Sequence, residues 1–128
     1  MNSNTNFETK FAPAKRSSDE TLLRQAYQLE KTYQLDQMYS AVPNPVIILN
    51  ETRQIVYANS AFRQIAHAAD WHDILGLRLG EAVQCIHAFD EPAGCGTTEF
   101  CSQCGAVNAM LQAQKGIADV QECRILAN

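Results

Sequence analysis

The fold is decided by residues 42–62, which read VPNPVIILNETRQIVYANSAF. The two prolines keep the start of this stretch extended, because proline fixes its own φ and restricts the residue before it. Val46–Leu49 is a continuous apolar run, typical of a strand buried on both faces. Residues 54–58 form a second run, and the four polar residues between the runs predict an antiparallel hairpin.

The residues after the hairpin predict a series of helices and a further strand. Asn59 is expected to cap a helix from Ser60 to about His67, with its inner face formed by Phe62, Ile65 and Ala66. Short helical turns are expected over 71–80, and a short helix over 81–88. Thr97 or Thr98 is expected to cap a longer helix that Gly116 ends, with a buried stripe of Phe100, Cys104, Val107 and Leu111. Val120–Leu126 predicts a third strand.

The residues before the hairpin divide into two segments. Residues 1–18 are polar and predict a disordered leader. From residue 19 an apolar stripe at helical spacing predicts an amphipathic helix over 19–40, capped by Asp19 or Thr21, with the stripe formed by Leu22, Ala26, Leu29 and Tyr33. Two interpretations of this helix remain open: it packs on its own domain, or it forms a short two-chain coiled coil. Residues 41–128 are then the main domain.

Composition limits the function classes. The chain has 128 residues and a net charge of -4, which fits one globular domain. The acidic balance argues against nucleic-acid binding, because nothing would neutralise a run of phosphates. The longest apolar stretch, Val46–Leu49, is too short to span a bilayer, and no signal peptide opens the chain. We therefore expect a cytoplasmic protein with no membrane contact from this segment.

The segments 42–50 and 54–62 resemble the opening of a PAS domain, and the likeness extends over 39–128. The resemblance implies an α+β fold, in which an antiparallel sheet carries helices on one face and an amphipathic N-terminal helix precedes it. Such a sheet has five strands, of which three are visible, so the chain is expected to be truncated before the last two strands. Members often pair through the N-terminal helix, so the resemblance also implies a homodimer.

Four of the five cysteines fall within residues 85–104. Together with one histidine they give five candidate metal ligands: Cys85, His87, Cys95, Cys101 and Cys104. Cys101 and Cys104 form a Cys-x2-Cys motif, which is a common half of a metal site, since residues three apart at a helix start face the same side. Zinc and an iron–sulfur cluster both fit this set. The interpretations without metal are buried thiols, or a reversible disulfide of Cys95 with Cys101 or Cys104.

The same cysteine segment is similar to a cysteine-rich PAS subgroup of bacterial sensor histidine kinases. The resemblance implies a sensory input domain of a two-component system, with a kinase region downstream and no enzyme activity in these residues. No flavin is expected, because the reactive-cysteine motif is absent, and no haem, because residues 98–115 contain no histidine. The alternative function is a constitutive dimerisation module with a structural zinc. Cys123 is expected to pack in the core, and a Cys-x2-Cys oxidoreductase is disfavoured because no βαβ pattern exists.

Overall fold

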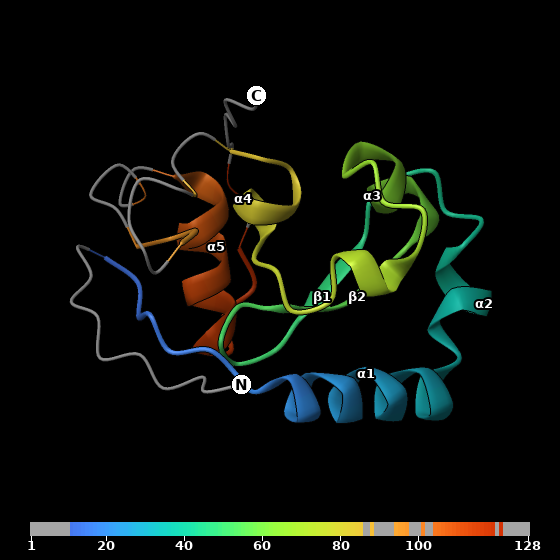
Figure 1. Ribbon diagram of the computed structural model, residues 1–128. Coiled ribbons are helices and arrows are strands. Elements are labelled where there is room, and N and C mark those ends of the chain that lie inside the picture. Colours follow the sequence, from blue (N-terminus) through green and yellow to red (C-terminus); the bar gives the residue numbers. More distant parts are fainter. Residues whose placement is uncertain are drawn as a thin grey trace. The chain divides into compact units, whose positions relative to one another are not determined.

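The computed structural model describes residues 11–85, 88, 94–97, 101, 104–119 and 121. These residues form two compact units, one containing 16–77 and the other containing 11–15 with the described residues from 78 onward. The elements of the first unit are α1 (Asp19–Tyr33), α2 (Leu35–Tyr39), β1 (Ile47–Leu49), β2 (Ile55–Ala58), α3 (Ser60–Ile65) and the 3-10 helix η1 (Trp71–Asp73) (Figure 1). The second unit contains α4 (Leu79–Ala82) and α5 (Gly105–Gln114). The expected α+β class is confirmed.

The hairpin forms as the sequence predicts. Strand β1 pairs antiparallel with β2, with Ile48 opposite Tyr57 and an irregularity between Ile48 and Leu49. The prediction that the first strand is buried on both faces is wrong: β1 is only half-buried, whereas every residue of β2 is buried. In the described residues β1 has one hydrogen-bonded neighbour, β2. The other edge of β2 is covered, because Ile55 exchanges backbone hydrogen bonds with Gly76 and Leu77.

The N-terminal helix packs against this hairpin within the first unit. Leu22 and Ala26 of α1 form a buried cluster with Val56 of β2, and Leu29 and Ile48 pack against that cluster. This packing is the one expected of a helix that covers its own domain. The prediction that Tyr33 belongs to the buried stripe is wrong, because its side chain is 58% exposed.

Gly76 lets Leu22 of α1 pack directly against the segment that borders β2. A Cβ at this position would lie 2.8 Å from Cδ1 of Leu22, and the residue has a φ of +84°. Both features exclude larger residues, because a left-handed backbone strains any residue that carries a Cβ. Gly76 therefore combines a turn with direct packing on α1.

The predicted helix over 19–40 is divided in two by Gln34. This residue has a left-handed backbone (φ 50°, ψ 52°), so α1 ends at Tyr33 and α2 begins at Leu35. The cap also differs from the prediction, because the Ser18 hydroxyl accepts the hydrogen bond from the Thr21 amide at 3.2 Å. No glycine or proline marks the break. Contacts of the next two residues offset the strain of Gln34, including a bond from the Asp36 amide to Glu30.

Asn59 caps α3, as predicted, and its side chain is fully buried. Its amide oxygen accepts from the backbone N–H of Val46 at 2.9 Å and of Phe62 at 3.1 Å. Its amide nitrogen donates to the carbonyl of Asn44 at 2.9 Å and also reaches that of Tyr39 at 3.3 Å. Phe62 is buried and Ala66 is half-buried, but Ile65 is 51% exposed, so its expected inward position is wrong.

In the second unit, both helices differ from their predicted bounds. Helix α5 begins at Gly105, with Cys104 rather than Thr97 at its N-cap, because the Thr97 hydroxyl donates instead to the Gly94 carbonyl at 2.6 Å. Val107 is buried in α5 as expected, and Gly116 follows its end with a φ of +80°. The helix expected over 81–88 forms earlier and is shorter, as α4 over Leu79–Ala82. It ends there because Gln84 adopts a left-handed backbone.

Several predictions fall on residues outside the described ranges. These are Thr98, Phe100, residues 1–10 of the leader and, except for Gln121, the third strand over 120–126. Residues 11–18 of the leader are described, and Ala12 and Ala14 are buried there. Among the described residues, no helix is long and apolar enough to cross a membrane.

The buried hydrogen bonds of Asn59 make its replacement costly. Asn59→Ala removes a helix cap and leaves the N–H groups of Val46 and Phe62 and the Asn44 carbonyl without this partner, so we expect the free energy of unfolding to fall by about 3 kcal/mol. Urea denaturation measures this loss. Asn44→Ala is the matched control, because Asn44 is exposed and its backbone carbonyl is kept. A change below about 0.5 kcal/mol for Asn59→Ala, the scale of an ordinary surface substitution, would contradict this account.

Candidate functional site

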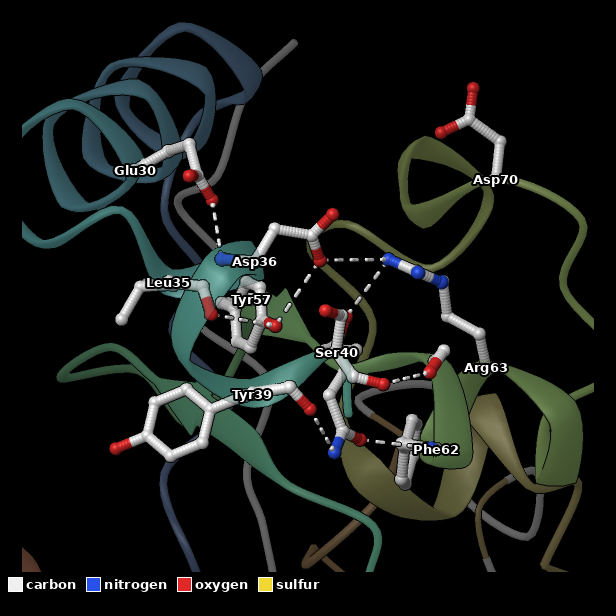
Figure 2. A network of polar contacts seen from close by, with 12 residues as sticks. Glu30, Leu35, Asp36, Tyr39, Ser40, Tyr57, Phe62, Arg63 and Asp70 are labelled. Carbon is white, nitrogen blue, oxygen red and sulfur yellow. Dashed lines mark hydrogen bonds and ion pairs between the residues drawn. The ribbon is translucent and has the colours of Figure 1, made fainter. Parts of the chain in front are cut away.

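A polar network joins α2, β2 and α3 in the first unit (Figure 2). The Tyr57 hydroxyl lies 3.3 Å from the carbonyl oxygen of Leu35 and 3.4 Å from Oδ1 of Asp36. Arg63 donates to the carbonyl of Ala58 at 3.1 Å, and its Nη1 lies 4.0 Å from the same Asp36 oxygen. Asp36 thus sits between a phenol and a guanidinium that come from two other elements.

A cavity of about 250 Å³ adjoins this network. Its walls are apolar at Ala26, Val56 and Trp71 and polar at four further side chains, which are Glu30, Asp36, Tyr57 and Arg63. The polar wall therefore carries two acidic side chains, one basic side chain and one phenol. Such a wall can bind a polar group by hydrogen bonds and charge.

Burial, the negative charge of Asp36 and the hydrogen bond to Asp36 together raise the pKa of Tyr57 from 10.0 to about 12, and burial is the largest of these causes. Arg63 opposes the shift, because its positive charge favours the phenolate. At neutral pH Tyr57 is therefore a protonated hydrogen-bond donor. It is suited to binding and positioning, and not to nucleophilic attack or proton abstraction.

The cysteines belong to the second unit, where the structure brings Cys85 and Cys95 together at α4. A Cβ built on Gly80 would lie 2.9 Å from Sγ of Cys95 and 3.2 Å from Cβ of Cys85. The Gly80 N–H donates to Sγ of Cys95 at 3.3 Å, and the Cys85 N–H donates to the Gly80 carbonyl at 2.7 Å. Two cysteines ten residues apart in the sequence therefore meet at one glycine.

Cys101 and Cys104 occupy a second cluster at the start of α5. Cys101 is buried with Ala12 and Val107, and Cys104 packs against this group. The Cys104 N–H donates to the Cys101 carbonyl at 3.0 Å, which closes a turn between them. The Ala12 N–H also donates to the Gly96 carbonyl, next to Cys95, so residue 12 contacts the backbone of one cysteine segment and the side chains of the other.

The five predicted metal ligands are only partly placed. His87 lies outside the described residues, and so does Cys123. The other four cysteines are described, and no disulfide joins any of them. Within the described ranges, no three His, Cys, Asp or Glu side chains gather closely enough to hold a metal ion. The metal site remains a prediction, and the described side chains form two cysteine pairs.

Sequence reasoning missed Glu81, which connects α4 to the first cysteine pair. One carboxylate oxygen accepts from the Arg78 N–H at 3.0 Å, and the other accepts from the Cys95 N–H at 3.2 Å. A glutamate three residues after a helix cap is a known signal for the first of these bonds. Nothing in the local sequence signals the second bond, because Cys95 is distant along the chain.

Comparison with known proteins gives one match. Residues 33–102 match a family model described as PAS domain, and this match covers more than half of the chain. It includes the hairpin, α3, α4 and three of the clustered cysteines. No curated protein matches the chain, and no solved structure matches it. The narrower cysteine-rich subgroup stays a prediction.

The raised pKa of Tyr57 predicts how stability depends on pH. Because the folded state binds the phenolic proton more tightly than the unfolded chain, this stabilisation is fully present below pH 10 and is lost as the pH rises to about 12. Asp36→Asn should lower the pKa of Tyr57 but leave it above 10.0, since burial is the larger cause. Phenolate absorbance against pH, as a difference from Tyr57→Phe, measures this pKa. Ionisation of Tyr57 at 10.0 in the folded protein would refute the assignment.

The packing at Gly80 predicts an unusual response to alanine. Alanine normally stabilises a helix by about 1 kcal/mol relative to glycine. Here its Cβ would overlap Sγ of Cys95, so we expect Gly80→Ala to destabilise the protein by about 1–2 kcal/mol in urea denaturation. The same substitution should cost less in a Cys95→Ala background, where that sulfur is gone. Stabilisation by Gly80→Ala alone would show that the cysteines do not pack as described.

Proposed function

The chain belongs to the PAS domain family, and from this membership we propose that it is the sensory input domain of a signal-transduction protein. A PAS domain indicates a sensory or signalling module, and the match includes α4 and the first cysteine pair but ends at residue 102, before α5. The output that we propose is a sensor histidine kinase of a two-component system, located in the cytoplasm. Catalysis would then belong to the kinase region, and the residues of this chain would control it.

The proposed sensing element is the cysteine set, acting through bound metal or through thiol oxidation. The observation that carries this proposal is that each cysteine pair includes residues that contact or cap a helix. Cys85 and Cys95 contact Gly80 in α4, and Cys104 is the N-cap of α5. A change at either pair would favour one arrangement of these helices over another, which is what a switch requires.

Zinc or an iron–sulfur cluster would be held by thiolates of this set, with His87 as a further ligand. The donor set fits either group, because thiolates bind both and a mixed Cys/His set is common for zinc. A bound metal would link α4 to α5 through their cysteines.

The second candidate function is a constitutive dimerisation module that zinc only stabilises. One surface favours a dimer in either case: a side of α1 that does not pack on the hairpin exposes Leu23 and Tyr27 to 50% and 65%. A homodimer through α1 is therefore part of both proposals. They differ in whether the cysteine set responds to its surroundings.

The test compares protein purified without oxygen with the same protein after exposure to air. We expect iron and sulfide with visible absorbance that bleaches in air, or thiols that oxidise, together with changed amide hydrogen exchange in α4 and α5. Helix α1 serves as the internal control, and a Cys101→Ala, Cys104→Ala double variant should reduce the response. Zinc content that does not change, at about one per chain, with identical exchange in both states would support the constitutive module instead.

A further inference from the structure

We propose that Cys85 and Cys95 are a redox pair that forms a reversible disulfide when a hydroperoxide oxidises the protein. The role of this pair in signalling rests on the sensory function proposed above, but its chemistry can be tested separately. The pairing differs from the one that sequence distance favours, in which Cys95 joins Cys101 or Cys104. It follows from the surroundings of Gly80.

Two distances place the two cysteines within reach of each other. Sγ of Cys95 and Cβ of Cys85 lie 2.9 Å and 3.2 Å from the same point, the position of a Cβ on Gly80. Because glycine has no side chain, no atom fills that point. A disulfide needs the two Cβ atoms about 3.5–4.5 Å apart, which side chains meeting at one small residue can reach with little movement of the backbone.

The backbone around the pair is held at both cysteines. The Cys85 N–H bonds to the Gly80 carbonyl at 2.7 Å, and the Cys95 N–H bonds to the Glu81 carboxylate at 3.2 Å. Both anchors belong to one turn of α4, so the two chain segments are fixed to the same short element. Such preorganisation raises the effective concentration of one thiol at the other.

The surroundings of the sulfur favour Cys95 as the thiol that reacts first. The Gly80 N–H points at Sγ of Cys95 at 3.3 Å, and a donor in this position stabilises the negatively charged thiolate. Cys95 is half-buried, whereas Cys101 is 6% exposed within an apolar cluster. A peroxide therefore reaches Cys95 more readily than Cys101.

The reaction balances in two steps. The Cys95 thiolate attacks one oxygen of hydrogen peroxide, so an S–O bond forms, the O–O bond breaks, and hydroxide leaves and takes up a proton to give water. The Cys85 sulfur then attacks the sulfenic sulfur, so the S–S bond forms, the S–O bond breaks and a second water leaves. Two thiols lose two electrons in total, and the peroxide gains both. A dithiol reductant reverses the change.

Oxidation would alter α4 directly. The disulfide draws Sγ of Cys95 toward Cys85, and so away from its hydrogen bond with the Gly80 N–H. It also closes the chain between residues 85 and 95 into a covalent ring. The change at the sulfurs therefore acts on the helix turn that holds both cysteines.

The test treats the reduced full chain with hydrogen peroxide, blocks remaining thiols by alkylation and maps cross-linked peptides by mass spectrometry. We expect the loss of two hydrogens and a Cys85–Cys95 cross-link roughly tenfold more abundant than any other cysteine pair, as proximity requires. Cys85→Ser and Cys95→Ser should each abolish it, and dithiothreitol should restore both thiols. The matched control is Cys123→Ala, which replaces the one cysteine outside the proposed ligand set and should form the cross-link as the wild type does.

The outcomes separate this inference from the proposed function. A dominant Cys95–Cys101 or Cys95–Cys104 cross-link, or cysteines that a bound metal keeps unreactive, would overturn the redox pair and leave a sensory domain intact. A Cys85–Cys95 disulfide that leaves hydrogen exchange in α4 unchanged would support the pair and argue against its signalling role. Loss of the cross-link in the control variant would overturn the pairing as well, provided that the variant keeps the circular dichroism of the wild type.

Discussion

The buried amide of Asn59 is the interaction on which the rest of the first unit depends. A side chain with no exposed surface must satisfy both its oxygen and its nitrogen inside the protein, and Asn59 does so entirely with backbone groups. One bond, from the Phe62 N–H, caps α3, and the others hold the loop that runs from Tyr39 to Val46. The end of β2, the start of α3 and the approach to β1 are therefore fixed by one residue.

Features that depend on local chemistry could be predicted from the sequence. Apolar runs on either side of a polar turn specified the hairpin, Asn59 specified the start of α3, and Gly116 specified the end of α5. The break at Gln34 could not be predicted, because glutamine is a good helix former and the residues that stabilise the break belong to other elements. The burial of the first strand was misjudged because it depends on which of its faces other elements cover, a property of the tertiary structure.

In the candidate site, too, contacts between residues close in sequence could be predicted, whereas contacts made by the tertiary structure could not. Spacing identified Cys101 and Cys104 as neighbours at a helix start, and they share one apolar cluster. The partner of Cys95 was not predictable, because Cys101 is closer to it in sequence while α4 brings it to Cys85. The network around Tyr57 was missed for a related reason. Each of its side chains is an ordinary residue of its own element, and only the fold brings them together.

The short helix α4 depends on contacts with other residues of the second unit. A helix of four residues has almost no stability of its own, so contacts from outside must hold its conformation. Arg78 precedes it and is buried, and its guanidinium donates to the Lys15 carbonyl at 2.8 Å. Cys85 and Cys95 lie against Gly80, and the Glu81 carboxylate accepts a hydrogen bond from the Cys95 N–H. Because so short a helix depends on such contacts, the disulfide proposed above would alter the helix itself, whereas a long and independently stable helix would resist it.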